Sequence, residues 1–535
     1  MISDSLNANV LSTEYPANID RYETQIGSEP PDFDHHEILV QSELELDGKK
    51  VQAYLTDTKL CWCATYGSTK IRKQRRSTHV INVSNIILTC YEQRDKKNKI
   101  VNEIELFPSQ YFSVHFAKKC KHHKWKYQCI HFHAADSEQC QAWVDGIQNL
   151  LMGFTRPKKL LVFINPVGGK KQGEKIYQEK VAPYFNIAKI SQTIIITERV
   201  NHAKDYLLSE DVSSFDGVLS VGGDGMLSEI INGMLRYRDG SHKVVKSSKD
   251  KPLIIGIIPA GSTDTVAYCT SGTNCPITAA LHIILGDQLP LDVCSVSESD
   301  KFLKYSVSLM GYGYFGDLAK ESEALRWMGP KRYEVAGFKR FMVNRSYEGE
   351  ISFVETQTEV ESKSRCQSGC QRCSMFLEET DHSVEDQWTT VRGRFISVIG
   401  ANISCRCARS STGLSPHAHT GDGCIDLILI KKTTRAKYLH HLIKVSEKTT
   451  EHFDFNFIDV HRVKEFKFKA LTSGNNADDE SNVESISSTS RAGHHHDHHH
   501  ETSVWNIDGE IVENPDIHIR VHRQLLTVFA RGIEE

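Results

Sequence analysis

One carboxylate in this sequence is surrounded by glycines. Residues 216 to 229 read DGVLSVGGDGMLSE, and Asp224 lies among Gly222, Gly223 and Gly225 where an apolar run gives way to a helical pattern. Glycines let a backbone approach an anion closely and adopt positive φ, and the free N–H groups of a helix start attract the same anion. The stretch predicts a phosphate site in which Asp224 accepts a proton from an attacking hydroxyl. Alone, the tetrapeptide also fits a tight strand-to-helix turn with a capping aspartate.

Strands and helices alternate on both sides of this turn, from residue 157 to about residue 300. Apolar runs such as KKLLVFINP, QTIIITE, FDGVLSVGG and PLIIGIIPAGS are separated by helical patterns such as NHAKDYLLSE. Continuous apolar strands separated by helices predict a parallel sheet covered on both faces, with ligands beyond the carboxyl ends of the strands. Each of these runs leads into a loop of small or polar residues, NPVGG, TERVN, GGDG or PAGST.

The flanking regions are rich in short strands. Residues 1–152 contain several β-like runs and one amphipathic helix with Trp143 on its apolar face, a pattern that resembles a pleckstrin-homology domain. Residues 301–535 predict a β-sandwich domain with an apolar-poor, disordered insertion at about 471–503, whose HHHDHHH run lacks fixed metal geometry. The expected fold class is α/β plus all-β, in three domains: 1–152, 157–300 and 301–535.

Composition limits the classes of function and the compartment. The formal net charge of -4 over 535 residues gives no global reason to expect nucleic acid as a partner. Apolar runs are shorter than the roughly 18 residues of a spanning helix, and the start MISDSLNANV does not fit a secretory signal. The odd number of cysteines, 15, favours reduced thiols in the cytosol. We therefore expect a cytoplasmic protein whose membrane contact is peripheral.

Two basic segments are candidates for that membrane contact. IRKQRR at 71–76 and KKCKHHKWK at 118–126 could form a cationic mouth for a phosphoinositide headgroup. They fit equally well as two solvated hairpin tips. We predict that residues 1–152 recruit the chain to anionic lipids.

Three cysteines, Cys366, Cys370 and Cys373, follow a CxxxCxxC spacing. This spacing can gather thiolates for zinc, with Cys405 or Cys407 as further ligands, although it falls short of a standard four-ligand signature. A loop of reduced thiols with a packing role fits as well. We predict a structural thiol cluster that supports the active protein, and we assign it no metal.

The motifs around Asp224 resemble, in their order, those of the superfamily of diacylglycerol, sphingosine and ceramide kinases. GGDGMLSEIINGM is preceded by FINPVGGKKQG and TERVNHA and followed by IGIIPAGSTDTVA. Four further stretches resemble the ceramide kinase branch, and the resemblance covers most of the chain: SLMGYGYFGDLAKESEALRWMGPKRYEVAG, CQSGCQRC, ANISCRCARSSTGLSPHAHTGDGCIDLILI and WNIDGE. The sequence contains neither a Walker-type GxxxxGK[ST] nor the HRD and DFG motifs of protein kinases.

The resemblance implies a role for each residue that matches a family motif. Asp224 is implied to be the catalytic base, and the lipid substrate is implied to meet Gly222, Gly223, Asp224, Gly225 and Asp317, with Asp317 receiving its polar head. The residues implied to bind ATP are Asn165, Pro166 and Val167 in the first loop, Thr197, Glu198, Arg199, Val200 and Asn201 in the second, then Glu229, Arg326, Arg332, Asp508, Gly509 and Glu510.

Several of these residues also have simpler interpretations. Glu229 fits a first-turn helix acid, Arg326 and Arg332 fit surface charges, and Asp317 fits a helix N-cap. One residue departs from the family pattern, because Lys171 stands where the family has a glycine. If that position requires positive φ, the first loop must take another shape.

The activity implied by the resemblance is in-line transfer of a phosphoryl group from ATP to the primary hydroxyl of ceramide, giving ceramide 1-phosphate. Mg²⁺ would bridge the phosphate oxygens, and the resemblance also suggests stimulation by calcium and a place at the Golgi or plasma membrane. Sphingosine and diacylglycerol stay open as acceptors, and a catalytically silent lipid-binding adaptor is the rival of another class. A kinase of a soluble nucleotide is a further alternative, because NAD kinases share a GGDG. The sequence carries no signal for an oligomeric state.

Overall fold

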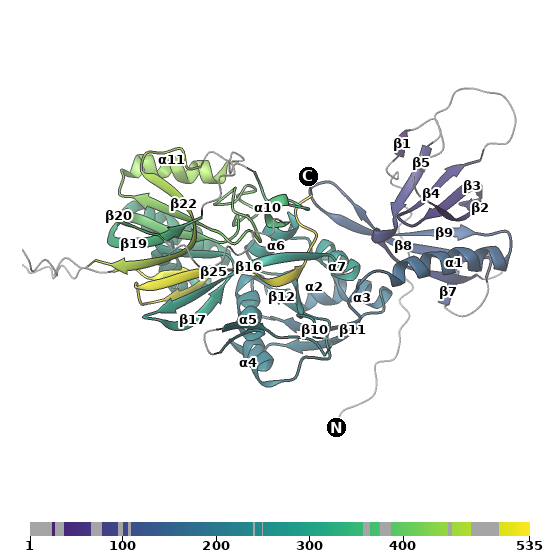
Figure 1. Ribbon diagram of the computed structural model, residues 1–535, viewed down its shortest axis with the longest axis horizontal. Helices are drawn as coiled ribbons and strands as arrows, with labels where there is room; N and C mark the ends of the chain where they lie inside the picture. Colours follow the sequence, from purple (N-terminus) through teal and green to yellow (C-terminus); the bar gives the residue numbers. More distant parts are fainter. Residues whose placement is uncertain are drawn as a thin grey trace, which may run out of the picture. The chain divides into compact units, whose positions relative to one another are not determined.

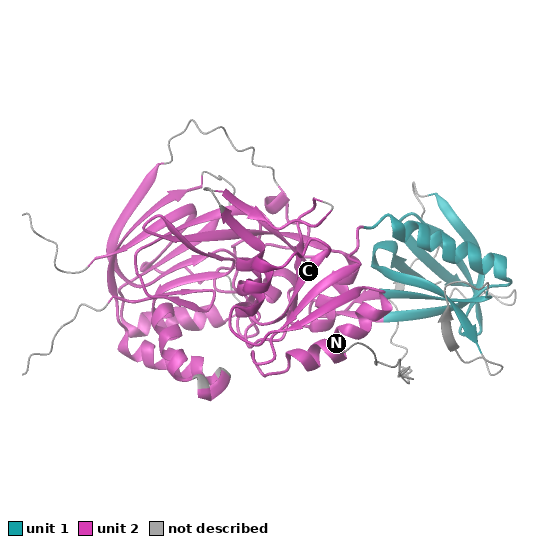
Figure 2. Ribbon diagram, turned by 90° about the horizontal axis from the view of Figure 1, so that it is seen from below, with its two compact units in different colours: residues 1–116, 128–154 teal, residues 117–127, 155–535 magenta. Residues whose placement is uncertain are grey.

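The protein is seen here as a computed structural model, in which its described residues form two compact units (Figure 2). One unit comprises residues 1–116 and 128–154, and the other comprises residues 117–127 and 155–535. The basic segment 71–76, the start MISDSLNANV and residues 472–501 with the HHHDHHH run lie outside the described residues. The structure describes residues 24–26, 37–65, 77–94, 100–104, 109–238, 241–248, 250–356, 364–374, 387–447, 452–471 and 502–534.

The first unit is a nine-stranded sheet packed against one helix, α1 (Ser137–Met152), as expected for a pleckstrin-homology-like domain (Figure 1). Asp136 begins α1 by accepting a hydrogen bond from the Gln139 N–H at 2.7 Å. Trp143 is fully buried on the apolar face, and its Nε1 donates to Ser42 Oγ at 2.8 Å. The sheet runs β1 (Thr24–Ile26), β5 (Ser77–Asn82), β4 (Lys59–Ala64), β3 (Lys49–Thr56), β2 (Ile38–Leu46), β9 (Trp125–His133), β8 (Tyr111–Lys119), β6 (Ile86–Arg94) and β7 (Ile100–Ile104), and a short 3-10 turn, η1 (Val83–Asn85), precedes β6.

In the second unit, four parallel strands pair in the order β11 (Ser191–Ile196), β10 (Lys159–Ile164), β12 (Gly217–Gly222), β15 (Ile254–Pro259). Leu161 and Phe163 share a core with the side chains of α4 and α5, whereas Leu219 lies against Ile283 of α7 beside Gly256. Helices therefore cover both faces, which confirms the α/β prediction. These helices are α2 (Gly173–Lys180), α3 (Ala182–Ile187), α4 (His202–Ser209), α5 (Asp224–Met234), α6 (Thr265–Ser271) and α7 (Pro276–Leu285); β13 (Leu235–Arg238) and β14 (Ser241–Val244) form a separate hairpin.

Strand β25 (Ile517–Phe529) connects the α/β sheet to the β-rich carboxyl-terminal region. Val528 pairs with Ile255 of β15, and β25 also pairs antiparallel with β16 (Gln288–Glu298) and β22 (Ile458–Ala470). Four strands then close a ring, because β19 (Tyr347–Glu355), β20 (Trp388–Ala401), β21 (Ile425–Lys431) and β22 each pair with the next. The remaining elements are β17 (Lys301–Ser306), β18 (Leu309–Gly313), α8 (Tyr314–Ala324), η2 (Arg326–Lys331), α9 (Arg332–Val343), α10 (Gln371–Ser374), α11 (Arg435–Ser446), β23 (Trp505–Ile507) and β24 (Glu510–Val512).

The basic segment 118–126 lies at the turn between β8 and β9. Trp125 is buried, with its backbone N–H donating to Thr278 Oγ1 at 2.9 Å and its Nε1 to Glu534 Oε2 at 3.0 Å. His123 Nδ1 lies 2.8 Å from the Glu534 carbonyl oxygen. Part of this segment is thus a packing element of the second unit, and the exposed basic residues at its tip include Lys121 and Lys124.

Candidate active site

Asp224 is the first residue of α5, directly beyond strand β12. Its carboxylate accepts hydrogen bonds from the Thr265 N–H at 3.0 Å and the Val266 N–H at 3.2 Å, in the first turn of α6. Burial raises the pKa of Asp224 above its ordinary value, although these two N–H groups act in the opposite direction. The carboxylate is therefore held in one orientation with an increased affinity for a proton.

The glycines around Asp224 do not adopt the positive φ that we expected of them. Gly222, Gly223 and Gly225 are absent from the left-handed backbone positions, and Gly223 has φ -99°. Gly223 is needed for packing, because a Cβ there would lie 3.1 Å from Cα of Gly261, and a Cβ at Gly222 would lie 2.9 Å from Cβ of Met226. At Gly225 a Cβ would meet nothing within 4 Å, so only this glycine leaves open space.

The first loop, after β10, is shaped by its own polar groups. Asn165 Oδ1 accepts hydrogen bonds from the Val167 N–H at 3.0 Å and the Gly168 N–H at 2.9 Å, and Val167 is exposed. Lys171 adopts φ 58° and donates its N–H to the Gly168 carbonyl at 2.9 Å. The loop therefore has positive φ at this position despite the missing glycine, at a cost of about 1–2 kcal/mol for an L-residue.

The second loop, after β11, is tied to α5 by Glu229. The Glu229 carboxylate accepts hydrogen bonds from the backbone at Asn201 and Ala203, and burial raises its pKa. Asn201 adopts φ 61° before α4 begins. Within the same loop, Thr197 Oγ1 donates to the Ile164 carbonyl at 3.3 Å, and the Glu198 N–H donates to His202 Nδ1 at 3.1 Å. Arg199 forms an ion pair with Asp205 at 2.6 Å. Val200 is exposed.

The turn formed by Asp508, Gly509 and Glu510 folds back onto α5. Glu510 forms an ion pair with Lys304 at 2.7 Å and accepts a hydrogen bond from Ser228 Oγ, one turn along α5 from Asp224, at 3.3 Å. Gly509 adopts φ 89°. The Asp508 carboxylate is occupied by the protein itself: it accepts from the N–H groups of Val307, Ser308 and Leu309 at 2.8 to 3.1 Å and from Ser308 Oγ at 2.5 Å.

Asp264 is a further buried carboxylate beside Asp224, and the motifs in the sequence did not predict a role for it. It adopts φ 55°, and its Oδ1 accepts from the Gly261 N–H at 2.8 Å. Burial, together with the negative charge of Asp224, raises the pKa of Asp264 to about 6. The charge of Asp508 in turn raises the pKa of Asp224. We call Asp224, Asp264 and Asp508 the carboxylate centre. One feature of the sequence could have indicated a role for Asp264: it comes directly after the PAGST loop, at the edge of the sheet where ligands are expected.

Comparison with known proteins gives matches along the three parts of the chain. Family models match as the ceramide kinase PH domain at residues 40–147, the diacylglycerol kinase catalytic domain at 159–296 and the ceramide kinase C-terminal domain at 307–535. Ceramide kinase of Mus musculus is 42% identical, over 79% of this chain and 84% of that protein. The chain belongs to the ceramide kinase family. Ceramide kinase of Homo sapiens is also 42% identical (79% of this chain, 83% of that protein), and that of Arabidopsis thaliana 31% (77% and 79%).

The residues that the family resemblance assigns to the lipid and to the ATP side lie on α8, η2 and α9. Asp317 accepts hydrogen bonds from Tyr347 Oη at 2.5 Å and from Ser503 Oγ at 2.6 Å, so it is not the N-cap of α8, which is Gly313. Arg332 donates to Tyr333 Oη at 2.7 Å and lies over that ring. The Arg326 side chain lies outside the described residues. The described contacts bring neither Asp317 nor Arg332 to the carboxylate centre.

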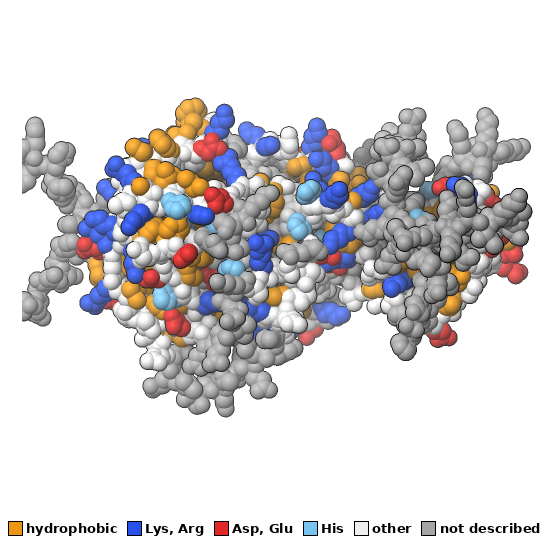
Figure 3. Space-filling view, turned by 90° about the horizontal axis from the view of Figure 1, so that it is seen from above, with side chains coloured by type: hydrophobic (Ala, Val, Ile, Leu, Met, Phe, Trp, Pro, Cys, Tyr) orange, Lys and Arg blue, Asp and Glu red, His pale blue; other side chains and the backbone are white. Residues whose placement is uncertain are grey.

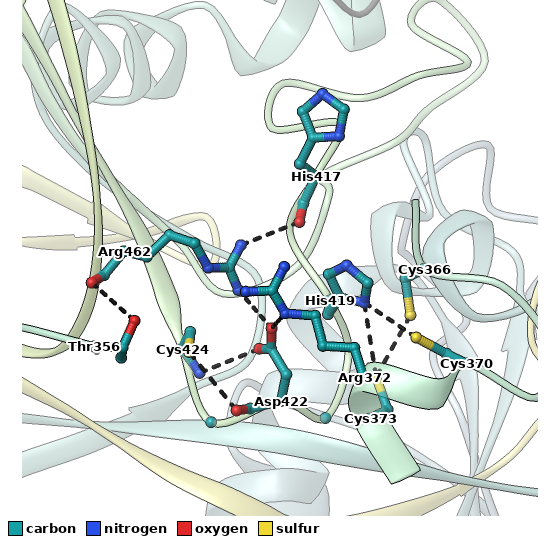
Figure 4. Close-up of polar contacts among 12 residues, drawn as sticks. Thr356, Cys366, Cys370, Arg372, Cys373, His417, His419, Asp422, Cys424 and Arg462 are labelled. Atoms are coloured by element: carbon teal, nitrogen blue, oxygen red, sulfur yellow. Dashed lines mark hydrogen bonds and ion pairs between the residues drawn. The ribbon is translucent and has the colours of Figure 1, made fainter. Parts of the chain in front are cut away.

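The three cysteines of the CxxxCxxC motif do gather, and a histidine joins them. Their Sγ atoms and a ring nitrogen of His419 lie within 4.8 Å of one another (Figure 4). We call Cys366, Cys370, Cys373 and His419 the thiol cluster. The structure places neither Cys405 nor Cys407 in it: Cys405 Sγ lies 3.2 Å from the Ile403 carbonyl, and Cys407 bridges to Ser410.

Within the described ranges, no helix is long and apolar enough to cross a membrane.

Proposed function

We propose that this chain transfers the γ-phosphoryl group of ATP to the primary hydroxyl of ceramide, giving ceramide 1-phosphate. The observation that carries the proposal is the position of Asp224. Its carboxylate lies in the GGDG turn beyond the carboxyl end of β12, and two N–H groups of α6, which follows the PAGST loop, fix its orientation. Ligands collect at this edge of parallel sheets, and the relatives of 31 to 42% identity are named ceramide kinases.

Asp224 is the general base of this reaction. Its raised pKa favours acceptance of the proton from the lipid hydroxyl as that oxygen attacks the γ-phosphorus. The bond from phosphorus to the β,γ-bridging oxygen breaks, ADP leaves, and the proton remains on Asp224 until water removes it. A base whose pKa stayed at the ordinary aspartate value would take the proton less readily.

ATP lies along the three loops that follow β10, β11 and β12. Gly225 leaves open space at the start of α5, where the free N–H groups of an eleven-residue helix attract phosphate. The remaining nucleotide contacts come from Asn165 and Asn201. Two backbone N–H groups hold the side chain of Asn165, and Glu229 holds the backbone of Asn201. Glu510 reaches the same helix, whereas Asp508 acts by fixing the turn.

The residues present fit a magnesium ion. Asp224 and Asp264, which lie close enough for their charges to interact, offer carboxylate oxygens to such an ion. Hard oxygen donors of this kind are what Mg²⁺ prefers. When bound with ATP, Mg²⁺ would neutralise charge on the phosphates.

On the lipid side, Asp317 receives the polar head of the sphingoid lipid. Tyr347 and Ser503 hold its carboxylate in place, and hydrogen bonds to a fixed acceptor discriminate between headgroups. Arg332 and Arg326 act on the nucleotide side, where a guanidinium neutralises phosphate charge. Sphingosine and diacylglycerol are the alternative acceptors.

The direct test is transfer from γ-labelled ATP to a panel of lipids in mixed micelles, with and without Mg²⁺. We expect label on ceramide, little on sphingosine or diacylglycerol, and none without a divalent cation; calcium in place of Mg²⁺ completes the panel. Transfer to another lipid alone would change the substrate assignment. Absence of transfer to any lipid would favour the adaptor, and transfer to NAD would favour the nucleotide kinase.

We also propose that residues 1–152 recruit the chain to anionic membrane lipids such as phosphoinositides, in keeping with the match to a PH domain. Deleting the region would also remove the packing of Trp125, so charge reversal is the cleaner test. Lys121→Glu/Lys124→Glu should lower sedimentation with phosphoinositide vesicles, because each lysine near such a surface is worth about 1 kcal/mol. Lys49→Glu/Lys59→Glu is the control at exposed sites of the sheet. An equal loss of vesicle sedimentation in both variants would mean that Lys121 and Lys124 form no specific headgroup site.

A further inference from the structure

We propose that Cys366, Cys370, Cys373 and His419 bind one structural Zn²⁺ ion. Three cysteine sulfurs and one imidazole nitrogen form a standard ligand set of closed, tetrahedral zinc sites. Figure 4 shows the four side chains converging from two segments, the cysteines around α10 and His419 in the chain leading to β21. Cys373 and His419 are almost completely buried.

The distances fit a tetrahedron around zinc. With Zn–S bonds of about 2.3 Å and a Zn–N bond of about 2.05 Å, tetrahedral angles give S···S edges of about 3.8 Å and S···N edges of about 3.6 Å. The Cys366 and Cys373 sulfurs lie 3.8 Å apart. His419 Nδ1 lies 3.2 Å from the Cys370 sulfur and 4.0 Å from the Cys373 sulfur. Zinc therefore fits with only small movements of the side chains.

The orientation of His419 also suits a metal ligand. Its Nδ1 faces the sulfurs, so Nδ1 coordinates the ion and the proton of the neutral imidazole lies on Nε2. A disulfide would use only two of the four groups, and the 3.8 Å between Cys366 and Cys373 far exceeds the S–S bond of about 2.05 Å.

The surroundings compensate for the charge of such a site. Three thiolates and one neutral imidazole around Zn²⁺ carry a net charge of about -1. Arg372, between two of the ligands in sequence, has 11% of its side chain exposed and pairs with Asp422 through Nε at 3.0 Å (Figure 4). Neither of its terminal guanidinium nitrogens has a hydrogen-bond partner among the described residues, so both remain as donors for thiolates.

The ion would hold together segments with little secondary structure of their own. Residues 364–374 contain one helical turn, α10. Their contacts with the rest of the unit include a hydrogen bond from Gln524 Nε2 to the Cys373 carbonyl at 2.6 Å and one from the Ser368 N–H to the Ile533 carbonyl at 2.9 Å. Beside His419, the Thr420 carbonyl accepts the Asp292 N–H of β16 at 2.7 Å. Zinc thus cross-links the cysteine segment to the junction of β16 and β25.

The experiment is metal analysis of the purified full chain, produced without an affinity tag that binds metals. Because the HHHDHHH run at 494–500 can also take up zinc, the six histidines are replaced by serine in every protein compared. We expect about one zinc per chain by elemental mass spectrometry. After exchange to Co²⁺, we expect the visible bands of tetrahedral cobalt and a thiolate charge-transfer band.

Matched variants assign the ligands. Cys370→Ser and His419→Ala should lower the zinc content from about one to near zero, whereas His419→Cys should retain it as a four-cysteine site. Cys407→Ser is the control and should keep full zinc content. If a variant does not fold, metal analysis of the parental protein still tests the proposal. Parental protein that contains no zinc and binds neither Zn²⁺ nor Co²⁺ would overturn it, and so would a Cys366–Cys373 disulfide found by peptide mapping.

Discussion

The carboxylate centre and the thiol cluster belong to the same unit but are built in opposite ways. Asp224 and Asp264 lie in loops directly beyond paired strands, and backbone N–H groups fix their side chains. The cysteines of the thiol cluster lie in a segment with one helical turn, and their side chains face mainly one another and His419. The paired strands thus keep the carboxylate centre rigid, whereas the thiol cluster depends on contacts among its own four side chains. Figure 3 shows acidic and basic side chains interspersed on one face of the molecule.

Asp224→Asn tests the carboxylate centre and should have the largest effect. Asparagine keeps the size of the side chain but cannot accept the proton, so kcat for lipid phosphorylation should fall by about 10² to 10⁴. ATP binding should change little and the protein should stay folded, although asparagine offers an acceptor to only one of the two α6 N–H groups. Radiolabel transfer and calorimetry measure the two quantities, and Asp211→Asn, at an exposed carboxylate, is the control. Parental turnover in Asp224→Asn would refute the base assignment.

Cys370→Ala/Cys373→Ala tests the thiol cluster and should show the reverse pattern. We expect the free energy of unfolding to fall by about 2–5 kcal/mol, by comparison with the loss of a native disulfide, which also cross-links distant segments. Activity should fall through loss of folded enzyme, with the KM for ATP of the remaining fraction unchanged. Urea titration and kinetics corrected for active protein measure these effects. Unchanged stability and turnover would show that the cluster supports neither.

The two glycines flanking Asp224 sharpen the comparison within the carboxylate centre. Gly225→Ala enters open space and improves helix propensity by up to about 1 kcal/mol, so stability should hold or rise. If phosphate approaches there, kcat/KM for ATP should nevertheless fall by about 10- to 100-fold. Gly223→Val should lower both quantities, with an overpacking cost of about 1–3 kcal/mol against Gly261. Full activity in Gly225→Ala would place the phosphates elsewhere.

Asp264→Asn should have the smallest effect, a shift of the pH profile. Asp224 must be ionised to act as base, so kcat/KM falls as pH drops through its raised pKa. The charge of Asp224 raises the pKa of Asp264, and repulsion between like charges is mutual. We therefore expect a neutral residue at position 264 to favour ionisation of Asp224 and to move the acidic limb to lower pH. Rates from pH 4.5 to 8 measure the limb. A shift to higher pH would contradict the coupling.

Much of the α/β architecture could be predicted, because apolar runs and loop residues are local signals. The backbone of the GGDG turn could not, since the conformation of Gly223 depends on contact with Gly261 in the loop of another strand. His419 was missed for a similar reason: it is far in sequence from the cysteines that it meets. Asp264 was missed because its burial beside Asp224 arises only when β12 and β15 pair.

The position of β25 has a consequence for how the enzyme is made. Ile255 of the α/β sheet pairs with Val528, and β16 pairs with β25 along most of its length. A ribosome must therefore synthesise nearly the whole chain before the sheet that carries Asp224 acquires its neighbouring strand. Pairing over such a separation is slow, and the incomplete sheet has an open edge in the meantime. Nascent chains that stop before residue 517 should thus depend on chaperones and lack kinase activity, even though Asp224, Asp264 and Asp508 have already been translated.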